Sequence, residues 1–290
     1  MVTDHFMTLD GLDFHYRDWG GQGHTIVLVH GLASTCHIWD LVAPRLTHKF
    51  KVVALDQRGH GETDQPDNNY DFVSVAQDLH KFTTALELGQ PTLIGHSWGG
   101  NVALQYSVMF PNSIASLILV DGGTIEPSNK PGYTWERARK EMTPPSFTNM
   151  TLDDLLQRAT KRWLGSIWSS EIKSILLANF HVSQSGIVTP RLKRENHMKI
   201  VRSLWDHKPS RLYSQVKCPT LLVPAWEESE DQRKLMFMDM KRNAIRLALD
   251  FIPSSKVVNM EQTMHDIPLH RPQELTDAIL EFACNTDQSL

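Results

Sequence analysis

Residues 92–100 read Thr-Leu-Ile-Gly-His-Ser-Trp-Gly-Gly, and this stretch decides the fold class. It begins with a short apolar run typical of a buried strand. The residues that follow it, NVALQYSVMF (101–110), have a helical pattern. Gly95 and Gly99 stand two residues before and two residues after Ser97. Since glycine permits close backbone approach, the motif predicts a sharp strand-to-helix turn that presents Ser97 at a helix N-terminus.

Ser97 is the predicted nucleophile of this turn. A five-residue GxSxG pattern is weak by itself, but the strand before it and the helix after it are the context that a nucleophilic serine needs. The alternative is an ordinary turn with a helix-capping serine. A serine hydroxyl is a poor nucleophile alone, so the hypothesis requires a general base and an acidic group that orients the base.

Apolar runs alternate with helical patterns along most of the chain, which predicts an α/β fold: a mostly parallel central sheet with helices on both faces. An antiparallel hairpin is expected before these runs, over residues 5–18 around Asp10-Gly11. A helix is expected over residues 71–89, with Ser74 and Gln77 as a capping box. The predicted strands are Thr25–Val29, Lys51–Asp56, Thr92–Gly95, Leu117–Val120, Thr220–Val223 and Lys256–Asn259.

Residues 124–215 interrupt this alternation. The segment is polar and helix-like and contains several prolines, and its tryptophans are Trp135, Trp163, Trp168 and Trp205. It predicts a helical cap of residues 124–215, inserted into a core formed by residues 1–123 and 216–290.

His265 is the predicted general base. It follows the last apolar run, in the loop NMEQTMHDIPLHRP (259–272), and loops after parallel strands lie on the same carboxyl edge of the sheet as the Ser97 turn. It also completes the chain order of serine, acid and histidine. His270 is the weaker candidate, because it is close to Pro272 and is expected to start the last helix.

Four ordered motifs make the chain resemble the α/β-hydrolase fold superfamily, and specifically its esterase-like members with a helical cap. They are His30-Gly31-Leu32, the DQRGHG stretch 56–61, the Ser97 turn and His265, and the resemblance covers nearly the whole chain. It implies an oxyanion hole formed by the backbone NH groups of Leu32 and Trp98. It also implies that His30 and the Arg58 loop hold the site's loops together and do not react themselves.

The acid is where the chain departs from this family's common pattern, Gly-x-x-Asp after the penultimate strand. Ala225 stands in place of the glycine, and Glu228 stands where the aspartate is expected. Some relatives carry the acid after the preceding strand, where this chain has Asp121. Either carboxylate could reach an imidazole from the same edge of the sheet, or could serve a turn or a solvated loop. Glu228 is slightly preferred over Asp121 as the third member.

The resemblance favours hydrolysis of carboxylic esters through an acyl-enzyme. The tryptophans and methionines of the predicted cap favour a small, apolar ester as the substrate. Carbon-carbon bond hydrolases, lactonases and cofactor-free perhydrolases would use the same residues. A serine at the turn disfavours haloalkane dehalogenases and epoxide hydrolases, which the resemblance associates with an aspartate there. A non-catalytic ligand receptor on the same scaffold is the alternative from another class.

Composition limits the partners. The net charge is −4, which gives no basic field for a nucleic acid, and no apolar run is long enough to span a membrane. Three cysteines without paired spacing indicate free thiols and a cytoplasmic location. There is no metal motif such as HExxH, and the glycines of residues 20–23 precede a strand, so no metal and no nucleotide cofactor is expected. The oligomeric state stays open.

Overall fold

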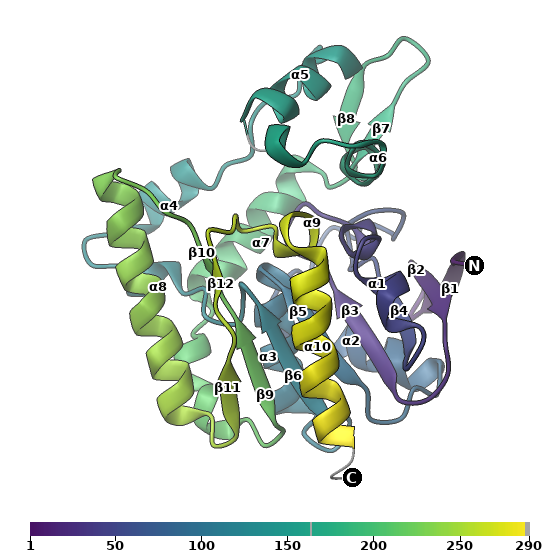
Figure 1. Ribbon diagram of the computed structural model, residues 1–290. Coiled ribbons are helices and arrows are strands. Elements are labelled where there is room, and N and C mark those ends of the chain that lie inside the picture. Colours follow the sequence, from purple (N-terminus) through teal and green to yellow (C-terminus); the bar gives the residue numbers. More distant parts are fainter. Residues whose placement is uncertain (163, 288–290) are drawn as a thin grey trace.

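An eight-stranded sheet forms the centre of the protein (Figure 1). The structure is a computed structural model, which describes residues 1–162 and 164–287. The first two strands join the sheet antiparallel, and all the other neighbours run parallel. In spatial order the strands are β1 (Thr3–Leu9), β2 (Leu12–Gly20), β4 (Lys51–Leu55), β3 (Thr25–Val29), β5 (Thr92–His96), β6 (Ser116–Val120), β9 (Thr220–Val223) and β11 (Ser255–Val257). The predicted α/β fold class is confirmed.

The predicted strands all occur, with small differences at their ends. The last one is the least accurate, because β11 stops at Val257 and the chain then forms the two-residue strand β12 (Met260–Glu261). That strand pairs in parallel with β10 (Ala225–Trp226), outside the main sheet. The hairpin of β1 and β2 turns at Asp10 and Gly11, which both have positive φ, 50° and 79°.

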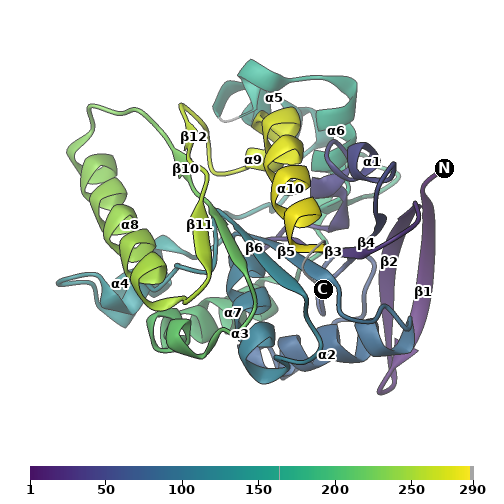
Figure 2. The ribbon, with the colours of Figure 1, turned by 60° about the horizontal axis from the view of Figure 1, so that its bottom comes forward.

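Helices cover both faces of the sheet, as Figure 2 shows. Alternate residues of a strand point to opposite faces, so Ile26 and Leu28 pack on one side and Val27 and Val29 on the other. The first side is covered by α1 (Ala43–Leu46) and α10 (Pro272–Asp287). The second is covered by α2 (Phe72–Ala85), α3 (Trp98–Met109) and α8 (Gln232–Phe251).

The predicted helix over residues 71–89 is α2, but its cap differs from the expected one. Asp71 is the N-cap residue, and its side chain accepts a hydrogen bond of 2.9 Å from the Ser74 backbone NH. The capping box of Ser74 and Gln77 is therefore wrong. Asp71 is as good a cap as serine, so the pattern alone did not fix which residue begins the helix.

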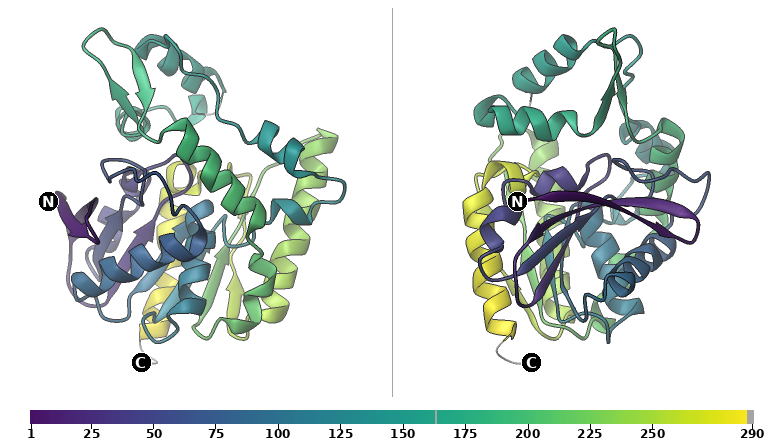
Figure 3. Two further views of the ribbon diagram at one scale, coloured as in Figure 1. Left: turned by 180° about the vertical axis from the view of Figure 1, so that it is seen from behind. Right: turned by 90° about the vertical axis from the view of Figure 1, so that its right-hand side faces the viewer.

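Residues 124–215 connect β6 to β9, and the part that carries α5, α6, β7 and β8 (residues 152–190) lies beyond the carboxyl edge of the sheet (Figures 1 and 3), whereas residues 209–215 pack beside α3 and α8. A short antiparallel pair, which the sequence did not predict, stands among the helices. Strands of three residues are too short to show a period-two pattern. Trp163, one of the four tryptophans named above, lies outside the described residues. The elements are α4 (Trp135–Glu141), α5 (Leu152–Arg162), α6 (Ser170–Leu177), β7 (Phe180–Val182), β8 (Val188–Pro190) and α7 (Arg194–Asp206).

None of the helices within the described ranges combines the length and hydropathy that a membrane crossing requires. The three cysteines are unpaired: Cys36 and Cys218 are buried, and Cys284 is partly exposed.

Candidate active site

Ser97 lies in the sharp turn between β5 and α3. Its φ and ψ are 54° and −124°, a combination that costs a non-glycine residue about 1–3 kcal/mol and persists only when its surroundings enforce it. Here the turn is enclosed by backbone atoms of neighbouring segments. A Cβ added at Gly99 would lie 2.3 Å from the His30 carbonyl oxygen, and one at Gly95 would lie 2.3 Å from the Gly99 carbonyl oxygen. The predicted strand-to-helix turn is present, and both glycines are needed to form it.

The His265 ring reaches Ser97 from the loop that follows β12. Its Nε2 lies 2.8 Å from the Ser97 Oγ, and its Nδ1 lies 2.6 Å from Asp121 Oδ2. We assign the Nδ1 hydrogen to the bond with Asp121, because the carboxylate can only accept, which leaves Nε2 free to accept from the serine hydroxyl. The structure thus brings together the two residues that sequence reasoning named as nucleophile and base.

Asp121, and not Glu228, is the carboxylate that contacts His265. The exposed Glu228 instead accepts a hydrogen bond of 3.0 Å from the Gln262 side chain. The preference for Glu228 is therefore corrected. The chain at Ala225 and Trp226 is extended as β10, which carries the following glutamates away from the imidazole, while Asp121 follows β6 directly.

The Asp121 side chain is only 5% exposed, and each of its carboxylate oxygens has a partner. Oδ2 accepts from His265, and Oδ1 accepts a bond of 3.0 Å from the Ala225 backbone NH and contacts the Lys241 ammonium. Burial alone would raise the pKa of Asp121, but the hydrogen bond and charge of His265, together with Lys241, lower it to about 2. The carboxylate is thus ionised at neutral pH. Sequence reasoning missed Lys241, which comes from α8.

Asp121 makes the His265 ring a stronger base than a free imidazole. Burial by the surrounding protein lowers its pKa, but the hydrogen bond and charge of Asp121 outweigh that effect, and the pKa is raised above its usual 6.5. Its own side chain is 51% exposed, toward the cavity described below. A ring so placed can meet both Ser97 and a bound molecule.

Leu32 and Trp98, whose backbone NH groups are expected to form an oxyanion hole, line the same cavity as Ser97. Trp98 is the first residue of α3, and the first four NH groups of an α-helix have no acceptor within the helix. Leu32 follows β3 in the neighbouring loop. The arrangement leaves both residues beside the serine, as such a role requires.

His30 and the Arg58 loop take part in hydrogen bonds that join the loops behind the site. The fully buried His30 accepts a 3.0 Å bond at Nε2 from the Gln57 backbone NH, and its carbonyl accepts one of 2.7 Å from the Gln57 side chain. Arg58 pairs with the buried Asp78 on α2, with Nη2 2.6 Å from Oδ1. Neither His30 nor Arg58 contacts Ser97 in these bonds, in keeping with the structural role implied by the resemblance.

His96, next to Ser97, is a second residue that sequence reasoning left without a role. Its ring is buried, and its Nε2 lies 3.0 Å from the His265 carbonyl oxygen. Burial, followed by the charge of His265, lowers the pKa of His96 to about 4. The ring is therefore neutral at pH 7 and can donate from Nε2 to that carbonyl, which ties the His265 loop to β5.

His270, the weaker candidate for the base, lies at the end of α9 (Ile267–His270) and does not start the last helix, which begins at Pro272. Its Nδ1 is 3.4 Å from the Met264 backbone nitrogen. The ring thus contacts the loop that carries His265 and is placed to support it.

A cavity of about 870 Å³ opens above Ser97, between α8 and the residues that follow β6. It is bordered by Ser97, Asp121 and His265 on one side. Both basic and acidic side chains line its wall, among them Lys130, Arg246, Glu126 and Asp250. The apolar part of the wall includes Leu32, Ile125, Met142, Leu204, Phe237, Met240 and Leu247.

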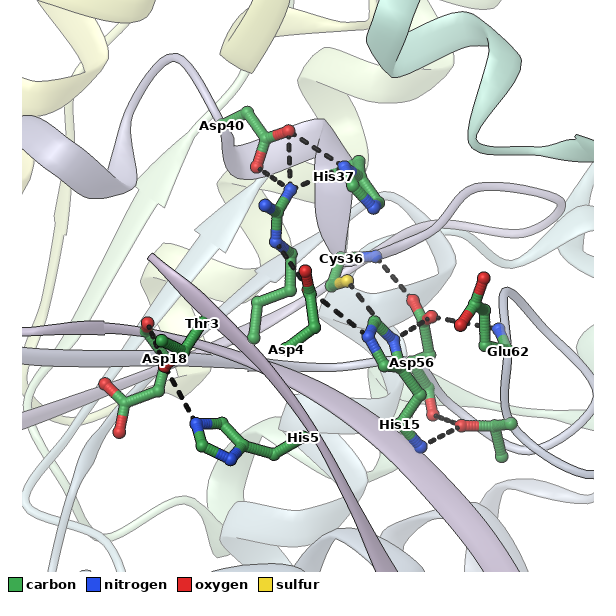
Figure 4. Close-up of polar contacts among 12 residues, drawn as sticks. Thr3, Asp4, His5, His15, Asp18, Cys36, His37, Asp40, Asp56 and Glu62 are labelled. Carbon is green, nitrogen blue, oxygen red and sulfur yellow. Dashed lines mark hydrogen bonds and ion pairs between the residues drawn. The ribbon is translucent and has the colours of Figure 1, made fainter. Parts of the chain in front are cut away.

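A separate buried cluster lies under the N-terminal hairpin, as shown in Figure 4. Asp56 accepts a bond of 2.7 Å from His15 Nδ1 and another of 2.7 Å from the Cys36 backbone NH. The Cys36 sulfur is 3.9 Å from the same His15 nitrogen. Such donors could ligate a soft cation. A cation would have to displace the His15 proton and ionise a thiol whose pKa burial and Asp56 raise well above its usual value, so we interpret the cluster as a hydrogen-bonded support.

The sequence profile of the alpha/beta hydrolase fold family matches residues 24–174, more than half of the chain. The chain belongs to the alpha/beta hydrolase fold family. The match covers the Ser97 turn, the Leu32 loop and Asp121, and the same sheet continues after the matched residues with β9 and β11.

Two characterised relatives of this hydrolase-family chain match it over less than half of its length. It is 35% identical over 134 residues to N-formylmaleamate deformylase of Pseudomonas putida, covering 44% of this chain and 50% of the relative. It is 37% identical over 116 residues to a non-heme chloroperoxidase of Streptomyces lividans, covering 39% of this chain and 42% of the relative. The chain spans half or less of the length of these curated relatives.

Solved structures resemble the protein over nearly its whole length. The crystal structure of E-2-(acetamidomethylene)succinate hydrolase has a TM-score of 0.77 at 19% sequence identity, and the match covers 98% of this chain and 100% of that chain. At that identity the likeness shows a shared fold. It extends the family's architecture to the region after residue 174.

Proposed function

We propose that the protein is a serine hydrolase that cleaves carboxylic esters through an acyl-enzyme intermediate. One observation carries the proposal: hydrogen bonds of 2.8 and 2.6 Å join Ser97, His265 and Asp121 in the order that nucleophile, base and orienting acid require. The balance of the pKa values supports it, since Asp121 is ionised and His265 can take a proton and hold it.

In the proposed reaction, Ser97 Oγ attacks the acyl carbon as its proton passes to His265 Nε2. Hydrogen bonds from the NH groups of Leu32 and Trp98 stabilise the negative charge on the oxygen of the tetrahedral intermediate. The His265 proton then goes to the leaving alcohol, and the acyl group remains on Ser97. A water molecule, deprotonated by the same ring, attacks the acyl-enzyme and releases the acid. Asp121 orients the ring and stabilises its charged form throughout.

The cavity supports a small substrate with an apolar part. The apolar side chains of Ile125, Met142, Phe237, Met240 and Leu247 line it near α8 and residues 124–142, so an aliphatic or aromatic acyl or alcohol group would be buried against them. Residues 124–215 supply Ile125, Met142 and Leu204 to that wall, and we propose that this segment acts as the cap. The same residues could also hydrolyse a lactone or a carbon-carbon bond, or form a peracid.

Amide hydrolysis is a second candidate, favoured by one specific observation. The names of the deformylase from Pseudomonas putida and of the succinate hydrolase with the same fold both denote substrates with an acylated nitrogen. The acyl-enzyme chemistry is the same for an ester and an amide, except that His265 must protonate a poorer leaving group.

A panel of substrates tests the proposal. We expect turnover of p-nitrophenyl acetate, butyrate and octanoate, with kcat/KM rising from acetate to butyrate as a longer acyl chain covers more of the apolar wall. An N-acyl amide and a γ-lactone in the same panel distinguish the alternatives. If a folded sample turns over the amide or lactone and none of the esters, the ester assignment is wrong; if it turns over nothing, a ligand-binding role replaces it.

The pH dependence of kcat/KM should show an acid limb. His265 must be neutral to accept the serine proton, and its pKa is raised above 6.5, so activity should fall as the pH drops through a midpoint above that value. Asp121, with a pKa of about 2, should contribute no limb between pH 4 and 9. A profile measured with p-nitrophenyl butyrate checks this. Constant activity down to pH 5 would contradict the role of His265.

A further inference from the structure

The Lys241 side chain, on α8, contacts the carboxylate of Asp121. Its ammonium group meets Asp121 Oδ1 and also donates to the Ala225 carbonyl oxygen. The lysine and aspartate side chains are only 11% and 5% exposed. Because burying an ammonium group is costly unless it is paired, a lysine held here has a partner that compensates for the lost water.

The two oxygens of the Asp121 carboxylate have different partners. Oδ2 faces His265 at 2.6 Å, while Oδ1 is held by Lys241 and by the Ala225 NH at 3.0 Å. With one oxygen fixed, the carboxylate cannot rotate away from the imidazole. The indole of Trp226, whose centroid is 5.2 Å from the Lys241 nitrogen, flanks the ammonium.

We propose that Lys241 is a positioning residue of the site, which fixes the orientation of the Asp121 carboxylate and balances its negative charge. The inference rests on the proposed function, because it assigns Lys241 to the support of the Ser97, His265 and Asp121 reaction. Lys241 contacts neither Ser97 nor His265 in the bonds described, so it acts through Asp121. It also connects α8, which borders the cavity, to the residues that react.

The charges around His265 predict how the site responds to loss of Lys241. Asp121 and Asp266 raise the pKa of His265, and Lys241 lowers it. His96, from β5, also faces the ring, at 5.0 Å between centroids, but is neutral because its own pKa is about 4. Removing the lysine charge should therefore raise the pKa of His265 further and move the acid limb to higher pH.

The test measures the rate at which a fluorophosphonate labels the protein, as a function of pH, since this reagent needs only an activated serine and no known substrate. Lys241→Met removes the charge and keeps the length of the side chain, Lys241→Gln keeps a neutral donor, and Lys241→Arg keeps the charge. Arg242→Met is the matched control. Arg242 lies over the same Trp226 ring at 5.4 Å, but it pairs with the exposed Asp239.

We expect Lys241→Met to be labelled about 10-fold more slowly than wild type at pH 7, with the midpoint of its acid limb moved to higher pH. Lys241→Gln should show the same shift, and Lys241→Arg should restore the wild-type midpoint. Arg242→Met should stay within about 2-fold of wild type. Thermal melting of each variant identifies those that fold, and the glutamine variant replaces the methionine variant if the latter does not.

Two outcomes overturn different claims. If wild type is labelled but the folded neutral variants match it in rate and midpoint, or if Arg242→Met shifts the midpoint as they do, Lys241 does not position Asp121. If folded wild type is not labelled at any pH, the proposed function fails, whatever the variants do.

Discussion

Replacing Ser97 with alanine is expected to lower kcat for p-nitrophenyl butyrate by about 10⁴- to 10⁶-fold while leaving the fold intact. Alanine removes the only atom that would attack the acyl carbon, and its methyl group occupies space already taken by the serine Cβ. Residual activity would come from the two backbone NH groups and from binding alone.

The matched control for this variant is Ser170→Ala, which removes an exposed hydroxyl at the start of α6, far along the chain from the turn. It should retain wild-type turnover. Ser97→Ala should melt within a few degrees of wild type, because the Ser97 hydroxyl bonds to a half-exposed ring at the cavity. If Ser97→Ala keeps more than a tenth of the wild-type kcat, the nucleophile has been assigned wrongly.

Replacing Asp121 with asparagine should lower kcat by about 10²- to 10⁴-fold. The amide can donate to His265 Nδ1, which favours the tautomer with hydrogen on Nε2, and that tautomer cannot accept the serine proton. The substitution also leaves the buried Lys241 without its anion, so we expect a lower melting temperature as well.

Glu228→Gln distinguishes the two carboxylates. Glu228 contacts Gln262 at the surface and not His265, so kcat should remain within about 2-fold of wild type. Steady-state kinetics of both variants with one ester makes the comparison. A large loss in Glu228→Gln with little loss in Asp121→Asn would reverse the assignment, and equal mild losses would mean that neither is the acid.

The sequence was informative where local pattern determines structure. An apolar strand, two spaced glycines and a helix were enough to predict the turn at Ser97, because only that order allows the close contacts of Gly95 and Gly99. His265 was predictable from chain order and from its place after the last strand. The second inference relies on the common carboxyl edge of parallel strands.

The choice of acid could not be made from sequence, because Asp121 and Glu228 both follow strands that end at this edge. What separates them is the course of the chain after β9, where β10 pairs with β12 and places the Ala225 NH, and not the Glu228 carboxylate, near His265 and Asp121. That pairing involves two residues in each strand and leaves no periodic signal.

The sequence pattern gives no sign that Lys241 belongs to the site. It is one of 29 lysines and arginines, and it occupies an amphipathic helix more than a hundred residues after Asp121. A surface lysine on such a helix has the same local pattern, so only the packing of α8 against the sheet shows that this one is buried. His96 was visible within the motif, but its contact with the His265 carbonyl depends on a loop 169 residues away.

The intact mass of wild type and Ser97→Ala after exposure to a fluorophosphonate tests the central claim most directly. We predict that wild type gains the mass of a single adduct, that peptide mapping places this adduct on Ser97, and that Ser97→Ala gains none. An adduct of equal yield on both proteins, or no adduct on folded wild type, would contradict the claim that Ser97 is an activated nucleophile.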